Sequence, residues 1–251
     1  MFPHAYFGGL WLPISHPSLI AWYDASDTSS ITGTTTVTEW VDKKNGYDLA
    51  PGIGPESGSR TYNDLNVLDF TGSEWLHYAG NIVPASGNLA IYMVAGVDAI
   101  DSPFDALWSI DGPDTDFQFD SNDNGSTGDF YGEIAGGMGT NVATSGGPYN
   151  GPSIYGNIFD WDGSTVGVYI DGTNDGSQTY GTQLSTTQTE WNVFTNRVQN
   201  QQIDGWCGEI VVMEDCSYAC RITIEGYLAH KWGLTGNLGA SHPYKNYAPT
   251  I

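Results

Sequence analysis

Short runs of alternating or continuous apolar positions, separated by turn residues, recur along most of the chain. Residues 89–97 are apolar on both faces, which predicts a central strand buried on two sides. Residues 165–170 alternate between apolar and polar or small residues, and Asp171 and Gly172 follow them as a hairpin turn. Further strands are predicted at residues 19–24, 36–42, 66–70, 116–120, 158–161, 190–194 and 208–213. The pattern therefore predicts an all-β sandwich.

One segment, near residues 217–232, has the periodicity of a helix instead. Its apolar residues fall on one stripe, formed by Ile224, Tyr227, Leu228 and Trp232. Asp215 or Ser217 is expected to cap its N-terminus, and Gly233 is expected to end it. We therefore expect one short helix near the C-terminus, followed by a loop-like tail.

The first 17 residues follow neither pattern. Their prolines and glycines interrupt any regular element, yet they hold five large apolar side chains: Phe2, Tyr6, Phe7, Trp11 and Leu12. A short extended arm cannot bury such side chains against itself, so it packs on its own domain or on a partner. We predict an aromatic anchoring arm, residues 1–17, that binds a partner through these five residues, and one domain, residues 18–251.

The charge of the chain restricts its partners. The formal net charge is −22, and the seven Lys and Arg residues are scattered without forming a basic patch. Nucleic acids and anionic membranes are bound by clustered positive charge, so we expect neither as a partner. No apolar run approaches the roughly 20 residues of a membrane span, and the first residues lack the features of a secretory signal. The three cysteines, Cys207, Cys216 and Cys220, are too few for a disulfide framework, so buried or spare thiols are expected.

Paired carboxylates of a glycosidase are not found within the predicted strands. Glu209 and Glu214 lie on opposite faces of one strand, whereas Glu209 and Asp215 share a face but are roughly 20 Å apart. Asp116 and Asp120 are separated by roughly 13 Å. Glycosidic carboxyl groups lie about 5–9.5 Å apart. We therefore interpret these residues as solvated carboxylates on outward faces and expect the chain not to be an enzyme.

One polar loop is a candidate calcium site. Asp120, Asn122 and Asn124 alternate and precede Gly125, as in the first half of an EF-hand loop. Tyr131 stands where that loop has its bidentate Glu, so Asp129 or Glu133 would have to replace it. The alternative is a polar turn after the strand that carries Phe117 and Phe119, in which case no calcium is bound.

Aromatic residues in the loops are candidates for glycan binding. Sugars stack on exposed aromatic rings beside Asn, Asp and Gly donors, a combination offered by Tyr131, Tyr149, Tyr155 and Tyr180. A large sandwich also uses aromatic residues to fill its core, so both interpretations stay open.

Several segments resemble the concanavalin A-like (laminin-G-like) jelly-roll superfamily. They are residues 22–27, 40–43, 65–72, 162–172, 208–210, 224–233 and 241–244, and the likeness extends over residues 19–249. The resemblance implies a jelly-roll β-sandwich with the short C-terminal helix, to which the extended arm is joined. Such domains occur in bacteriophage structural proteins and bacterial surface proteins, so the resemblance implies the fold rather than the role.

Two functions are weighed on this basis. The first is a non-enzymatic structural protein of a phage virion, such as a capsid decoration, head-fibre or tail-associated component. It would be held to other virion proteins by the arm and, by analogy, would form a homo-oligomer, often a trimer. The alternative is a lectin-like carbohydrate-binding module of a phage or bacterial surface protein, located outside the cell. The alternative predicts that glycan binding survives deletion of residues 1–17.

Overall fold

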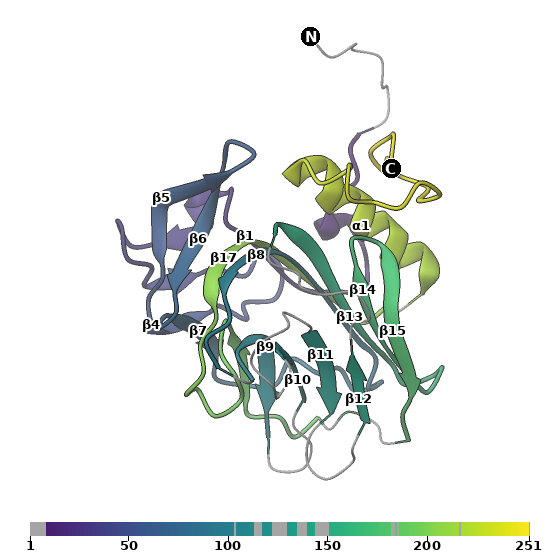
Figure 1. The fold of residues 1–251 in the computed structure, drawn as a ribbon, viewed down its shortest axis with the longest axis horizontal. Helices are drawn as coiled ribbons and strands as arrows, with labels where there is room; N and C mark the ends of the chain where they lie inside the picture. The colour runs from purple at the N-terminus through teal and green to yellow at the C-terminus, as the bar shows by residue number, and fades with distance from the viewer. Residues whose placement is uncertain are drawn as a thin grey trace.

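The computed structural model describes residues 9–102, 104–112, 117–121, 130–134, 140–143, 151–181, 184, 186–215 and 217–250. In this part of the chain two antiparallel sheets pack face to face, and one helix covers the outer side of the larger sheet (Figure 1). The all-β sandwich with one C-terminal helix is therefore confirmed. Among the described residues, no helix is long and apolar enough to span a membrane.

The larger sheet has eight strands in the order β15-β14-β13-β8-β17-β6-β5, with β1 also paired to β17. The strands are β1 (Leu19–Asp24), β5 (Glu56–Tyr62), β6 (Leu65–Thr71), β8 (Leu89–Ala99), β13 (Ser153–Asp160), β14 (Thr165–Ile170), β15 (Thr173–Thr179) and β17 (Asp204–Met213). The predicted hairpin at Asp171 and Gly172 joins β14 to β15, and both residues have the positive φ that a two-residue turn requires.

The smaller sheet has seven strands in the order β12-β11-β10-β9-β16-β7-β4. They are β4 (Ala50–Ile53), β7 (Trp75–Tyr78), β9 (Ala106–Asp111), β10 (Phe117–Ser121), β11 (Phe130–Ile134), β12 (Thr140–Ala143) and β16 (Glu190–Val193). A two-stranded ribbon, β2 (Ile31–Thr32) with β3 (Glu39–Trp40), and two 3-10 turns, η1 (Pro13–Ser15) and η2 (Thr28–Ser30), complete the described elements. The strand predicted over residues 36–42 is thus only two residues long.

The protein has two apolar layers, one on each side of the larger sheet. Side chains such as Trp108, Phe117 and Phe119 fill the space between the sheets, as the alternation of β10 predicts. On strand β8, Ile91 and Met93 face that core, whereas the intervening Tyr92 faces the helix layer. This explains why residues 89–97 are apolar on both faces.

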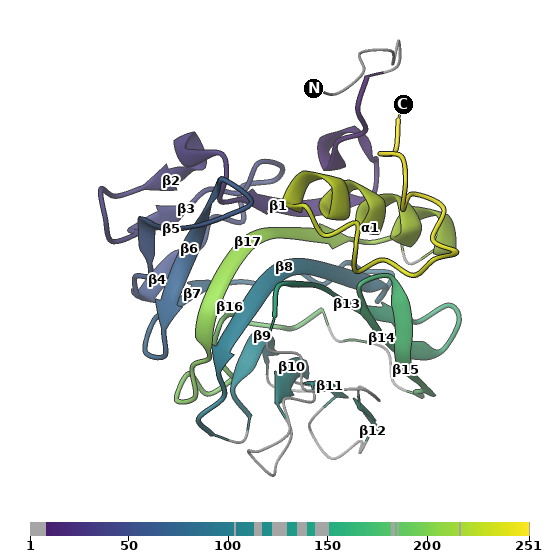
Figure 2. The ribbon, with the colours of Figure 1, turned by 45° about the horizontal axis from the view of Figure 1, so that its top comes forward.

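Helix α1 (Tyr218–Trp232) forms the second layer (Figure 2). Ser217 caps it by accepting a hydrogen bond from the Cys220 amide, and Gly233 ends it in the left-handed conformation at φ 71°. The predicted stripe of apolar residues faces the sheet. Trp232 lies directly over Gly208 of β17, where a Cβ atom would be 2.8 Å from the indole ring, so only glycine permits this approach.

The described part of the arm packs on its own domain. Leu10 forms a β-bridge with Thr250, and the Trp11 amide donates to the Pro249 carbonyl at 3.1 Å. The Trp11 ring is only 8% exposed and meets the ring of Tyr227 edge to face at 5.8 Å. Trp11 is therefore largely covered by its own helix, and the binding of a partner through it stays a prediction.

Of the other four apolar arm residues, the structure describes one, Leu12. Leu12 is 43% exposed, and Phe2, Tyr6 and Phe7 lie outside the described residues. A contact of these side chains with a partner stays a prediction, as do the homo-oligomer and the boundary at residue 17.

Candidate functional site

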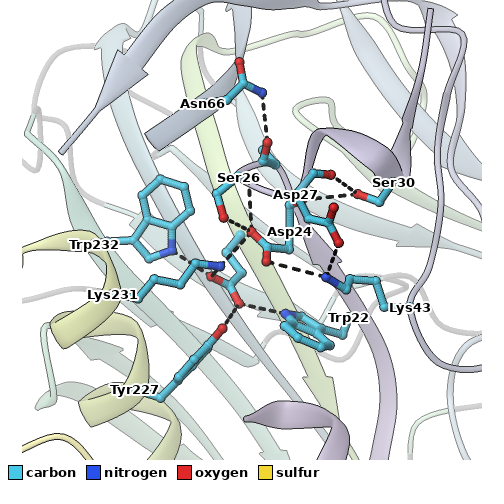
Figure 3. Close-up of polar contacts among 12 residues, drawn as sticks. Trp22, Asp24, Ser26, Asp27, Ser30, Lys43, Asn66, Tyr227, Lys231 and Trp232 are labelled. Carbon is cyan, nitrogen blue, oxygen red and sulfur yellow. Dashed lines mark hydrogen bonds and ion pairs between the residues drawn. The ribbon is translucent and has the colours of Figure 1, made fainter. Parts of the chain in front are cut away.

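The candidate site lies between helix α1 and the paired strands β1 and β17. In the antiparallel pairing of β1 with β17, Asp24 stands directly opposite Glu209. Side chains two residues apart on a strand share a face, so Trp22 and Asp24 both point toward α1, as Glu209 does. Figure 3 shows Trp22 and Asp24 beside Tyr227, Lys231 and Trp232 of the helix.

Glu209 is fully buried and holds this meeting point together. Its Oε1 accepts hydrogen bonds from the Trp22 indole at 2.7 Å and from the Tyr227 hydroxyl at 2.8 Å. Its Oε2 accepts from the Trp232 indole at 2.7 Å and lies 2.7 Å from the Lys231 ammonium. A carboxylate offers about four acceptor positions, so these four donors occupy all of them.

The surroundings act on the titration of Glu209 and Tyr227. Burial raises the pKa of Glu209, while the Lys231 ammonium acts in the opposite direction. Burial and the neighbouring Glu209 both raise the pKa of Tyr227, so its hydroxyl stays protonated and serves as a donor. The interpretation of Glu209 as a solvated carboxylate on an outward face is therefore wrong, because the helix layer covers that face.

Asp24 is the second carboxylate of the site and faces a cavity. Its Oδ1 accepts from the amide and hydroxyl of Ser26, at 3.1 and 2.6 Å, and lies 2.6 Å from the Lys231 ammonium. Its Oδ2 has a longer contact, 3.7 Å, with Lys43. Lys43 lies 2.6 Å from Asp27, which lowers the pKa of that carboxyl to about 2. Asp24 Oδ2 is therefore held less closely by a cation than Oδ1 is.

The cavity beside Asp24 has a volume of about 390 Å³, within the range of small-molecule sites. Three aromatic side chains form part of its wall: Trp11, Trp22 and Tyr227. Asp24, Ser26, His230 and Lys231 supply its polar groups. The cavity thus places apolar rings next to hydrogen-bonding groups.

Both ends of the chain contribute to the rim of this cavity. Leu10 and Leu12 come from the arm, and Ala248 and Pro249 come from the C-terminal tail. The bridge between Leu10 and Thr250 joins the two segments. The arm is therefore part of the site, a role that the sequence did not indicate.

The geometry of Asp24 and Glu209 resembles that of a catalytic pair in one respect. Both contacting oxygens lie within 2.7 Å of the same Lys231 nitrogen, so their separation does not exceed the roughly 5–5.5 Å of a retaining glycosidase. However, Glu209 has no exposed surface and no vacant acceptor position. It cannot reach a sugar without breaking the network that holds the helix.

The tyrosines predicted as glycan platforms lie elsewhere. Tyr155 is 2% exposed and packs near Phe119 in the core, and Tyr180 is 3% exposed beside Trp161. The strand alternation turns Tyr155 inward, so these two rings cannot stack on a ligand at the surface. Tyr149 and the side chain of Tyr131 lie outside the described residues.

The calcium prediction falls mainly on residues that the structure does not describe. Asp120 is buried in β10, where Gln118 donates to its carboxylate, although Asp120 was expected to face outward. Asn122, Asn124 and Asp129 lie outside the described residues, so the calcium site stays a prediction.

A second group of metal-binding residue types gathers at the start of α1. A ring nitrogen of His16, a carboxylate oxygen of Asp215 and the Cys220 thiol lie within 4.8 Å of one another, and His16 Nε2 is 3.7 Å from Asp215 Oδ2. The Nδ1 of His16 accepts a hydrogen bond from the Ser18 amide at 3.2 Å, which leaves the proton of the neutral ring on Nε2. Because Nε2 is the atom that would bind the ion, we assign no metal to this group.

The two described cysteines are expected to be unreactive. Burial raises the pKa of Cys220 to about 12 and that of Cys207 well above its usual value. At pH 8 roughly one Cys220 in ten thousand is then a thiolate, the reactive form. In a Cys216→Ser variant we expect no thiol to react with Ellman's reagent within minutes in the native state, and two to react in denaturant. Rapid reaction of the native variant would contradict this assignment.

The sequence matches no protein-family model and no curated protein. Among solved structures, it is similar to Domain 4 of AbnA, a GH43 extracellular arabinanase from Geobacillus stearothermophilus, in complex with arabinotriose. The TM-score is 0.56 at 12% identity, and the match covers 83% of this chain and 98% of that domain. It is also similar to Trypanosoma rangeli sialidase in complex with sialic acid, with a TM-score of 0.61 at 12% identity. That match covers 87% of this chain but only 34% of the sialidase.

At this level of identity the likenesses show the β-sandwich fold. They also correct the first functional prediction, a structural protein of a phage virion. The two structures named above belong to glycoside hydrolases with sugars bound, not to phage structural proteins.

Proposed function

We propose that this chain is a carbohydrate-binding domain whose saccharide occupies the cavity between β1, α1 and the two ends of the chain. The observation that supports this most is the composition of the cavity wall. Trp11, Trp22 and Tyr227 stand beside Asp24 and Ser26 within one cavity of about 390 Å³. Apolar surfaces with a few placed polar groups are typical of small-molecule sites.

Each part of the cavity suits one part of a sugar. The C–H faces of a sugar ring are apolar and pack against aromatic rings, whereas its hydroxyls need acceptors and donors. Asp24 Oδ2 can accept from a hydroxyl, and hydrogen bonds to a charged carboxylate are stronger than neutral ones. The network around Glu209 fixes Trp22 and Tyr227 in place, so little ordering is required when a ligand binds.

The proposed domain binds without cleaving. A retaining mechanism needs one carboxylate at the sugar and another that delivers a proton. Asp24 reaches the cavity, but Glu209 is buried with all its acceptor positions occupied. The pair therefore supports the helix rather than catalysis.

The fold comparison supports the proposal. The arabinanase domain is almost wholly covered by the match and is described with a bound trisaccharide. By this likeness we also infer that the chain acts outside the cell.

The proposal is tested by titrating the protein with a panel of oligosaccharides that includes arabinotriose. We expect binding in calorimetry, a change in tryptophan fluorescence, and no new reducing ends. Ala248 of the C-terminal tail lines the cavity, so Ala248→Trp fills it and should abolish binding. Ala240→Trp makes the same change at an exposed tail position outside the cavity and should leave binding intact. Absence of binding across the panel would refute the proposal, and release of reducing ends would refute its non-catalytic part.

A further inference from the structure

Positive charge is scarce in this protein, and most of it is already held by protein oxygens. The chain has 7 Lys and Arg against 29 Asp and Glu. Lys43 contacts Asp24 and Asp27, Arg60 contacts Asp69 and Asp98, Arg221 contacts Glu225, and Lys245 donates to the carbonyls of Thr235 and Leu238. An acidic ligand would therefore find few free cations.

The positive charge inside the cavity is also paired with protein oxygens. Of the described residues that line it, Lys231 is the one Lys or Arg, and its ammonium lies 2.6 Å from Asp24 and 2.7 Å from Glu209. His230 also lines the cavity, but its Nε2 donates to the Tyr244 carbonyl at 2.8 Å. The carboxylate of Asp24 balances the positive charge of Lys231 whether Glu209 is charged or protonated. The cavity floor has no net positive charge.

We propose that the cavity selects neutral saccharides and rejects those that carry a carboxylate. This inference rests on the proposed carbohydrate-binding function and names its ligand class. A uronic or sialic acid residue would place its carboxylate beside Asp24, and juxtaposed like charges are costly when desolvated. The overall charge of −22 opposes such a ligand at long range as well. A neutral sugar meets neither obstacle, since Asp24 and Ser26 serve its hydroxyls.

Asp24 is accordingly the specificity-determining residue. Its carboxylate both accepts from hydroxyl groups and neutralises Lys231. Asp24→Asn removes the charge that repels an acidic ligand and leaves the positive charge of Lys231 less neutralised. The variant should therefore bind acidic saccharides less weakly relative to neutral ones. Asp101→Asn makes the same change at an exposed position outside the cavity and serves as the matched control.

The test compares neutral and acidic saccharides of related skeleton: lactose with sialyllactose, xylotriose with glucuronoxylotriose, and galactotriose with trigalacturonate. In calorimetry at low salt, neutral members that bind should do so at least about tenfold more tightly than their acidic partners. The difference in affinity between neutral and acidic members should be smaller in 0.5 M salt, because screening weakens the long-range part of the repulsion.

The variants sharpen this comparison, with folding checked by thermal unfolding. Asp24→Asn should reduce the neutral-to-acidic ratio by at least about threefold, and Asp101→Asn should leave it unchanged. Equal or tighter binding of the acidic members would overturn the inference and leave the proposed function standing. If neither member of any pair binds, the proposed function fails. An unchanged ratio in folded Asp24→Asn would remove Asp24 from the role given to it here.

Discussion

Replacement of Trp11 by alanine is expected to weaken saccharide binding by roughly tenfold to a hundredfold, equivalent to about 1–3 kcal/mol. Trp11 forms part of the cavity wall, and its ring is held against Tyr227 by the edge-to-face contact. The variant removes an aromatic surface on which a sugar ring can lie, and it opens the cavity to water. Calorimetric titration with a ligand from the panel measures the effect directly.

Trp75→Ala is the matched control for this experiment. Trp75 lies on β7 of the smaller sheet, is partly buried, and does not line the cavity. Its replacement should leave the affinity unchanged. If Trp75→Ala abolished binding while folded Trp11→Ala retained it, the saccharide site would lie on the smaller sheet, contrary to our proposal.

The same reasoning applies to removal of the arm. From sequence alone, a carbohydrate-binding module was expected to keep its glycan affinity without residues 1–17. In the structure Leu10, Trp11 and Leu12 line the cavity, so deletion of residues 1–12 should reduce the affinity at least as much as Trp11→Ala. Retention of full affinity by the truncated, folded protein would contradict the assignment of the cavity.

Hydrophobic periodicity predicted the elements that bury apolar residues at regular intervals. Strands β1 and β8 and helix α1 were found because their apolar residues repeat at the periods of strand and helix. Edge strand β5 was missed, since its residues are mainly exposed and polar and give no apolar signal. Edge strand β15 has the same character and was indicated only by the hairpin turn before it. The strand predicted at residues 36–42 is only the two residues of β3, Glu39–Trp40.

The candidate site could not be predicted from spacing within one strand. The search for paired carboxylates compared Glu209 with Glu214 and Asp215, which are neighbours in sequence. Its actual partner, Asp24, is far away in sequence and stands opposite it only because β1 pairs with β17. Non-local strand pairing of this kind leaves no local pattern, although a Glu amid the apolar residues of β17 was a signal that it required buried partners.

Replacement of Glu209 by alanine is expected to have the largest effect on stability, a loss of about 3–5 kcal/mol. The change leaves the ammonium of Lys231 with one partner and leaves the donors of Trp22, Tyr227 and Trp232 without an acceptor inside the fold. Buried polar groups without partners are costly, and the four donors come from two elements that Glu209 joins. Folded domains have about 5–15 kcal/mol of stability in total, so the variant should be close to unfolding.

Urea and thermal unfolding measure this loss. For a domain of this size each kcal/mol lowers the melting temperature by roughly 2–4 °C, so a fall on the order of 10 °C is expected. Glu56→Ala, at an exposed position of edge strand β5, is the control and should change stability by less than about 0.5 kcal/mol. The stability loss of Glu209→Gln should lie between those of Glu209→Ala and Glu56→Ala. The Gln side-chain oxygen still accepts hydrogen bonds, but its NH2 group faces donors that need an acceptor. If Glu209→Ala lost no more stability than Glu56→Ala, the network would not hold the helix to the sheet. The rigid cavity wall on which the binding proposal depends would then need another source, since Trp22 and Tyr227 are both oriented by this carboxylate.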